Sequence, residues 1–140
     1  GESAKHLLLK ALLWAAIVHT HDQALCEPDN LPYLYKPDVV VLHPQSHVPV
    51  WWGECGSVST EKLRRLTAAL PDTRFSIAKW GRSDLRGYAA SLRRELELPR
   101  RAPIDVISFP DDSASRFLDE AGNIDVTIDE LIKMDLMIRL

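Results

Sequence analysis

The topology of the chain follows from residues 36–56, which read KPDVVVLHPQSHVPVWWGECG. An apolar run at residues 38–42 follows a proline and predicts a buried strand, and residues 48–55 predict a second strand. Residues 44–47 between them hold proline, serine and histidine, which are typical of a turn. Two strands joined by so short a turn form an antiparallel hairpin.

Two carboxylates are expected to meet on one face of this hairpin. Side chains alternate along a strand, so Glu54 shares a face with Trp52 while Cys55 points the other way. The turn is nearly equidistant from Asp38 and Glu54, which brings these residues close together across the pair. Neighbouring carboxylates repel unless one is protonated or a cation lies between them. A hard divalent ion such as Mg²⁺ or Mn²⁺ prefers such oxygen ligands, and we expect one here.

The segments around the hairpin predict an alternation of helices and strands. Ser3 is placed to cap a helix that runs to about residue 19 and is apolar nearly all round. We expect this helix to lie across a sheet and to be covered again, by other helices or by a partner chain. Further predicted elements are a short strand at residues 24–27, a helix at about 60–70, a strand at 74–80, a helix at about 83–96 and a strand at 104–109.

This order predicts the α/β fold class, with a mixed sheet flanked by helices on both faces. The length of 140 residues predicts a single domain over residues 1–140. From about residue 110 the chain is acidic, and we read it as a C-terminal extension whose elements the pattern leaves unassigned.

The composition, 46% hydrophobic and 26% charged, is that of an ordinary globular protein. The apolar run at residues 7–18 is interrupted by Lys10 and is too short to span a bilayer. It also lacks the features of a signal peptide, so we expect a cytoplasmic protein without a membrane partner. Cys26 and Cys55 are too few for a disulfide framework or a self-contained zinc site.

The net charge of −3 is distributed unevenly. Residues 1–61 carry a net charge of −4, residues 62–101 carry +7 and residues 102–140 carry −6. The basic middle predicts a nucleic-acid partner, whose phosphates we expect to contact Arg64, Arg65, Lys79 and Arg82. The alternative is that these side chains lie on solvated helix faces and pair with nearby acids.

The hairpin motifs carry a family resemblance. Lys36-Pro37-Asp38, followed by Trp52-Gly53-Glu54-Cys55-Gly56, resembles the PD-(D/E)XK nuclease superfamily, which has the restriction-endonuclease-like fold. With Glu-x-x-x-His-x-x-x-Lys at residues 2–10, the pattern is similar to the small YaeQ-like and uncharacterised bacterial branches of that superfamily. The resemblance covers roughly residues 2–80. It implies an αβββαβ core and metal-dependent phosphodiester hydrolysis, with DNA as the favoured substrate.

The resemblance also implies roles for particular residues. Asp38 and Glu54 match the two metal-binding acids, Glu2 matches a helix carboxylate that joins the site, and the backbone carbonyl of Cys55 would be a further ligand. The family expects a water-orienting lysine two residues after the second acid, where this chain has Gly56. The candidate replacements are Lys36, preferred because alternation puts it on the face of Asp38, and Lys62, one turn into the following helix. If neither lysine reaches the two acids, we expect the protein to bind metal or nucleic acid without cleaving phosphodiester bonds.

Two other function classes fit parts of the sequence. Small residues flank Cys55 between a strand and a helix, as in a nucleophile elbow, which would make Cys55 the nucleophile of a hydrolase. The histidines precede Cys55, however, whereas elbow hydrolases place theirs last. The apolar first helix and the Trp51-Trp52 pair would suit a homodimer or a non-catalytic interaction protein. We favour sheet core on opposite faces for the two tryptophans.

Overall fold

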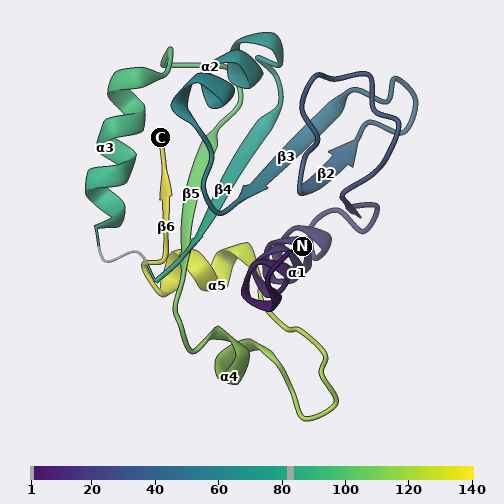
Figure 1. Ribbon diagram of the computed structural model, residues 1–140, viewed down its shortest axis with the longest axis vertical. Coiled ribbons are helices and arrows are strands. Elements are labelled where there is room, and N and C mark those ends of the chain that lie inside the picture. The colour runs from purple at the N-terminus through teal and green to yellow at the C-terminus, as the bar shows by residue number, and fades with distance from the viewer. Residues whose placement is uncertain (1, 82–83) are drawn as a thin grey trace.

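A single six-stranded sheet forms the centre of the computed structural model, which describes residues 2–81 and 84–140 (Figure 1). Its strands lie side by side in the order of the sequence. They are β1 (Leu25–Cys26), β2 (Val39–Leu42), β3 (Pro49–Cys55), β4 (Arg74–Trp80), β5 (Ile104–Phe109) and β6 (Met137–Arg139).

The sheet mixes parallel and antiparallel pairs, as the order of elements predicted. Strands β2 and β3 form the antiparallel hairpin, and β1 and β6 join antiparallel at the two edges. Helix α2 (Thr60–Ala69) connects β3 to the parallel strand β4, and α3 (Leu85–Glu95) connects β4 to the parallel strand β5. The predicted α/β class is therefore confirmed, and β4 and β5 have the predicted bounds.

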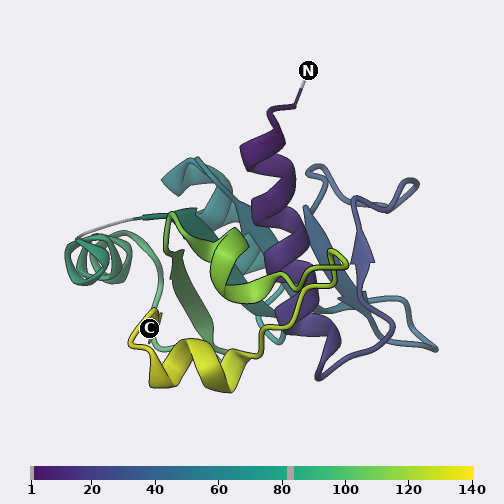
Figure 2. The same ribbon diagram turned by 90° about the horizontal axis from the view of Figure 1, so that it is seen from below.

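Helices cover both faces of the sheet (Figures 1 and 2). One face packs against α1 (Ala4–Val18), α4 (Ser113–Phe117) and α5 (Ile128–Lys133), and the other against α2 and α3. Trp51 is buried in the first of these cores and Trp52 in the second, which confirms that the pair belongs to opposite faces of the sheet.

Most of helix α1 after its first turn is buried by other segments of the same chain. The Ser3 hydroxyl accepts a hydrogen bond from the backbone N–H of His6 at 3.1 Å and caps the helix, as predicted. Leu12 and Leu13 are fully buried, in the same core as Val126 and Leu131 of the C-terminal segment. Figure 2 shows this segment passing beside α1, so the buried part of the helix lies between the sheet and the end of the chain, while Leu7 near its start is 57% exposed.

The acidic C-terminal segment is tied to the core. Strand β6 pairs with β5, and the fully buried Asp105 carboxylate accepts hydrogen bonds from Arg74 Nε and Arg139 Nε, both at 2.8 Å. These bonds join three neighbouring strands at one buried charge. The segment predicted as an extension thus contributes an edge strand to the sheet.

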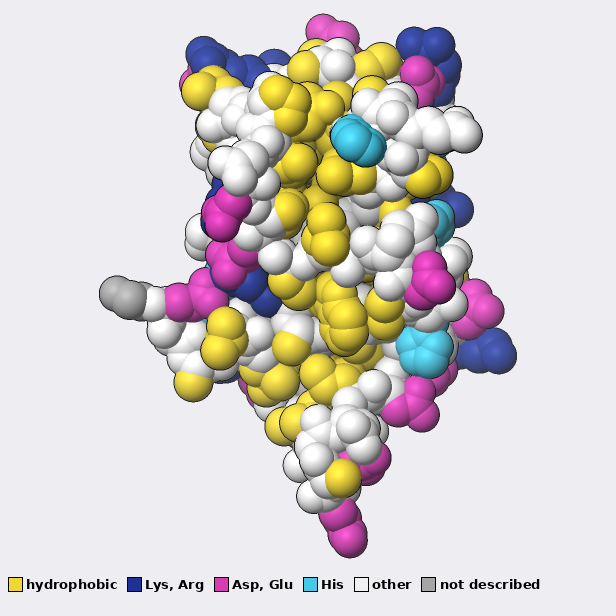
Figure 3. All heavy atoms as spheres, turned by 90° about the vertical axis from the view of Figure 1, so that its right-hand side faces the viewer, with side chains coloured by type: hydrophobic (Ala, Val, Ile, Leu, Met, Phe, Trp, Pro, Cys, Tyr) yellow, Lys and Arg dark blue, Asp and Glu magenta, His cyan; other side chains and the backbone are white. Residues whose placement is uncertain are grey.

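The start of the third helix differs from its predicted position. The predicted start of the third helix at Ser83 lies outside the described residues, and α3 begins at Leu85 with the Asp84 side chain accepting from Gly87 N. Within the described parts of the chain, none of the helices has the length and apolar character needed for a bilayer crossing. Figure 3 shows hydrophobic side chains gathered in a band on the side of the molecule that carries β2 in Figure 1.

Candidate functional site

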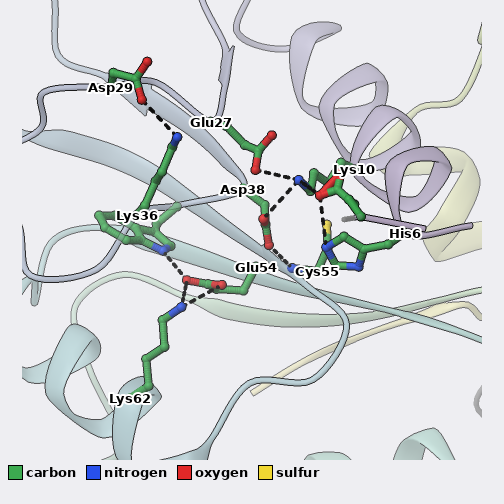
Figure 4. Close-up of polar contacts among 11 residues, drawn as sticks. His6, Lys10, Glu27, Asp29, Lys36, Asp38, Glu54, Cys55 and Lys62 are labelled. Carbon is green, nitrogen blue, oxygen red and sulfur yellow. Dashed lines mark hydrogen bonds and ion pairs between the residues drawn. The ribbon is translucent and has the colours of Figure 1, made fainter. Parts of the chain in front are cut away.

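Asp38 and Glu54 lie at the same end of the β2–β3 hairpin (Figure 4). Val39 is paired with Gly53, and the N–H of Asp38 donates to the Gly53 carbonyl at 3.1 Å, so Asp38 comes beside Glu54 in the register. The N–H of Cys55 donates to Asp38 Oδ2 at 2.8 Å and holds that carboxylate against the end of β3. This is the carboxyl end of the parallel strands, where ligands of α/β proteins commonly bind.

Glu54 is a buried acid with two donors. It is 4% exposed, and its Oε1 accepts from the indole Nε1 of Trp52 at 2.9 Å. The Lys62 ammonium lies 3.0 Å from Oε1 and 3.2 Å from Oε2. Burial raises the pKa of Glu54 above its ordinary value, the two donors oppose this, and the charge of Asp38 adds to the rise.

The position of Lys62 follows from local structure. Gly56 has a φ of +80°, a conformation that L side chains rarely adopt, and a Cβ there would lie 3.2 Å from the His6 ring. The chain therefore turns at the position where the PD-(D/E)XK motif, which these residues resemble, has a lysine. Ser59 then caps α2 by accepting from the backbone N–H of Lys62, which places Lys62 in the first turn, over Glu54.

Lys36, the preferred candidate, is placed elsewhere. Its Nζ donates to Asp29 Oδ1 at 3.0 Å and points away from Asp38 and Glu54 (Figure 4). Strand β2 begins only at Val39, so strand alternation does not extend back to Lys36. The preference for Lys36 is therefore not supported by the geometry, and Lys62 is the candidate that contacts a site acid.

A lysine that the sequence argument did not assign lies beside Asp38. Lys10 of α1 has a side chain only 5% exposed, and its Nζ contacts Glu2 Oε2, Glu27 Oε1 at 2.6 Å and Asp38 Oδ1 at 3.8 Å. Burial alone lowers the pKa of Lys10, but the hydrogen bonds to Glu2 and Glu27 and the charge of Asp38 outweigh it and leave that pKa above its ordinary value. The signal for this contact in the sequence is that Lys10 interrupts the apolar run at residues 7–18.

The predicted metal ligands divide into two groups. Glu2 contacts Lys10. Figure 4 shows Asp38 facing Lys10 and Glu54 facing Lys62. Among residues 2–81 and 84–140, no group of three or more histidine, cysteine or acidic side chains is arranged to hold a metal ion. The two lysines thus balance carboxylates that the sequence argument assigned to one cation.

Cys55 contributes its backbone to the site, while its thiol faces the core on the α1 side of the sheet. The side chain is 4% exposed, and burial, together with the charges of Asp38 and Glu54, raises the pKa of the thiol. Because the thiolate is the nucleophilic form, this setting does not favour a nucleophilic Cys55.

Of the basic residues predicted to contact nucleic acid, Lys79 lies beside the site, and the two arginines of α2 lie in exposed ion pairs. Lys79 Nζ donates to the Gly56 carbonyl at 2.7 Å and so lies at the end of β3 beside the site. Arg64 and Arg65 lie on α2 in exposed ion pairs with Glu95 at 3.2 Å and Glu61 at 2.9 Å. Such exposed pairs are weak and can exchange for phosphate contacts. Arg82 lies outside the described residues.

The fold and the paired acids at a hairpin end define an α/β protein with a carboxylate–lysine site, and this fold occurs in solved structures. The YaeQ protein from Xanthomonas axonopodis pv. citri superposes with a TM-score of 0.52 at 14% sequence identity, over 76% of this chain and 57% of that chain. The YaeQ protein from Pseudomonas syringae superposes with a TM-score of 0.52 at 15% identity, over 79% of this chain and 57% of that one. The chain has a YaeQ-like fold and spans somewhat more than half the length of these relatives.

No protein-family profile matches the chain, and no curated protein matches it.

Proposed function

We propose that the protein is a metal-dependent nuclease of the PD-(D/E)XK type, which hydrolyses phosphodiester bonds. The observation that carries the proposal is the Lys62 ammonium 3.0 Å from Glu54, because it supplies the cation that the motif lacks at Gly56. The Asp38–Glu54 pair at the hairpin end and the resemblance of the motifs to that superfamily support it further, as does the YaeQ-like fold.

The acids present suit a hydrated divalent ion. Mg²⁺ is commonly held by one or two carboxylates and keeps several waters. Asp38 Oδ1 is 3.8 Å from Lys10 Nζ, beyond hydrogen-bond distance, and Asp38 is close enough to Glu54 to raise its pKa. Asp38 and Glu54 would hold Mg²⁺ or Mn²⁺, with Glu2 and the Cys55 carbonyl as the further ligands implied by the resemblance. Such an ion polarises a phosphoryl oxygen and lowers the pKa of a bound water.

The remaining groups orient the acids and the substrate. The Trp52 indole and the Cys55 N–H each donate to one carboxylate, which fixes the rotamers of Glu54 and Asp38. Lys62, held against Glu54, would orient the attacking water. Lys79 at the end of β3 and the arginines of α2 would position the phosphate backbone of DNA without reading its sequence.

A second candidate function is nucleic-acid binding without cleavage. Lys10 and Lys62 already balance charge at the two predicted metal-binding acids, which favours a site that has lost its metal. A homodimer would use the hydrophobic band of Figure 3 and is compatible with either function.

The deciding experiment is a cleavage assay on plasmid and labelled oligonucleotides with Mg²⁺, Mn²⁺ or EDTA. We expect metal-dependent cleavage that falls by about 10²-fold or more in Asp38→Asn and Glu54→Gln, because each removes one carboxylate charge from the site. Asp29→Asn is the matched control, since Asp29 is an exposed acid paired with Lys36. Wild-type protein that binds DNA but neither cleaves it nor gives a calorimetric Mg²⁺ signal would support the second candidate and refute the first.

A further inference from the structure

An apolar pocket lies between the loop at residues 33–35 and helix α2. Its volume is about 200 Å³, and its lining includes Tyr33, Leu34, Tyr35, Arg65, Leu66 and Ala69. Leu34 is 82% exposed, although it is a large hydrophobic residue. Arg65 also lines the pocket, while its guanidinium forms an ion pair with Glu61 at 2.9 Å.

The walls of this pocket touch the residues that hold Glu54. The Lys62 ammonium lies over the Tyr35 ring at 5.3 Å from its centroid and is also the ion-pair partner of Glu54. The Tyr33 ring packs edge-on against Trp52 at 5.9 Å, and Trp52 donates to the same carboxylate. Two independent contacts therefore join the pocket to the acid, each through a single intervening side chain.

We propose that this pocket receives one nucleobase of a single-stranded nucleic acid whose phosphodiester lies at Asp38 and Glu54. The inference rests on the proposed function and names the substrate class. Aromatic side chains stack on base faces, and arginine adds cation–π and edge contacts, in proteins that bind single strands. Tyr33 and Tyr35 supply the aromatic rings, Arg65 lies in the wall beside them, and a volume of about 200 Å³ admits one base rather than a base pair.

The proposal implies a preference for single strands over duplexes. A base in a duplex is stacked and paired, so bringing it into a pocket requires that these contacts be broken. Base stacking on an aromatic side chain contributes to the affinity for a single strand, so loss of the pocket should weaken binding by about tenfold.

The test fills the pocket without changing any charge. Ala69 is exposed at the end of α2 and lines the pocket, whereas the neighbouring Ala68 is exposed and lines a different depression beside Arg100. Fluorescence anisotropy with a labelled 12-nucleotide single strand, in EDTA to prevent cleavage, compares wild type, Ala69→Phe and Ala68→Phe. We expect about tenfold weaker binding for Ala69→Phe, binding within about twofold of wild type for Ala68→Phe, and weaker wild-type binding to the matching duplex.

A second arm asks whether the base itself is bound. An oligonucleotide that lacks bases should bind wild type about tenfold more weakly, yet should bind Ala69→Phe no more weakly than the intact strand does. Leu34→Ser, at an 82% exposed position, gives an independent loss of the apolar wall without a change of charge if Ala69→Phe does not fold. Equal affinity of wild type and both pocket variants, or tighter binding of the duplex, would overturn the proposal.

The outcomes separate the pocket from the nuclease chemistry. Cleavage that is unaffected by Ala69→Phe, with unchanged binding, refutes the pocket and leaves the nuclease standing. Base-dependent binding without cleavage at any metal concentration refutes the nuclease and supports the pocket. If Ala69→Phe changes the molar mass in light scattering but not the affinity for the strand, the pocket is a contact between copies of the chain and the proposal fails.

Discussion

Lys62 Nζ lies 3.0 Å from Oε1 of Glu54, so helix α2 supplies the cation beside the second acid of the hairpin. Strand β3 cannot supply it, because the chain turns at Gly56 with a φ of +80°. Lys62 follows Glu54 by eight residues in the sequence, and the two side chains are in contact. This contact makes the function testable by single substitutions.

Replacement of Lys62 by methionine should abolish most of the proposed cleavage while leaving the fold intact. Lys62 is partly exposed and packs over Tyr35, so methionine keeps the aliphatic contact and removes only the charge. Loss of a group that orients the attacking water lowers kcat by about 10²–10⁴-fold. The measurement is single-turnover cleavage of a labelled oligonucleotide, with circular dichroism as the check on folding.

Lys36→Met is the matched control for Lys62. Lys36 forms an exposed ion pair with Asp29, so its loss should leave cleavage within about twofold of wild type and stability within about 0.5 kcal/mol. A larger effect of Lys36→Met than of Lys62→Met would contradict the assignment of the lysine to α2.

Replacement of Lys10 by methionine should destabilise the protein. The substitution removes the ammonium that lies among Glu2, Glu27 and Asp38, and these like charges then repel. Glu2 and Glu27 are partly exposed, so we expect a loss of roughly 2–4 kcal/mol, below the upper range for fully buried pairs. Thermal unfolding measures the loss, and millimolar Mg²⁺ should raise the Tm of this variant more than that of wild type.

Lys5→Met provides the comparison on the same helix, since the Lys5 side chain is 66% exposed and lies 4.0 Å from Asp111. It should change the Tm little. Equal stability of Lys10→Met and wild type would show that the three carboxylates need no cation.

Asp105→Asn should also lower stability. Asp105 is fully buried between Arg74 and Arg139, and asparagine leaves the partly buried Arg74 guanidinium without its counter-charge. Loss of one partner from such a buried pair costs about 3–5 kcal/mol. Chemical denaturation measures this cost, and the exposed Asp111→Asn, whose side chain is 77% exposed, should stay within about 0.5 kcal/mol of wild type. A loss of similar size in both variants would contradict the role of Asp105 as a tie between strands.

The raised pKa of Glu54 predicts that Glu54→Gln raises thermal stability relative to wild type by an amount that depends on pH. The folded-state pKa of Glu54 lies above the ordinary value of 4.5, so the folded chain binds the proton more tightly than the unfolded chain does. The contribution of Glu54 to stability therefore falls as the pH rises from about 4.5 toward the folded-state pKa. Glutamine has no charge and keeps an oxygen that accepts from Trp52. The Tm of Glu54→Gln minus that of wild type should therefore grow from about pH 4 to about pH 7. A difference that shrinks over this range would show that Lys62 outweighs the burial of Glu54.

Several features of the fold could be read from local sequence. The turn between the two apolar runs predicted the β2–β3 hairpin, and alternation placed Trp51 and Trp52 on opposite faces, where both are buried. Ser3 caps α1 through a hydrogen bond that spans three residues. These features depend on neighbours in the chain, and such short-range patterns carry their own physical signal.

The charge contacts of the site were settled by packing. Lys10 reaches Asp38 only because α1 lies across the sheet, and the partner Glu27 comes from the loop after β1. Strand alternation favoured Lys36 over Lys62 in the sequence, but the loop before β2 turns Lys36 toward Asp29.

By itself, the sequence determined the hairpin, the order of helices and strands up to residue 109 and the presence of two acids at one hairpin end. The tertiary structure decided which cation meets which acid, and it added β6 to the sheet through pairing with β5. The reason is physical. Periodicity and caps act over a few residues, whereas an ion pair between distant segments forms only where the packing of apolar faces brings their side chains together.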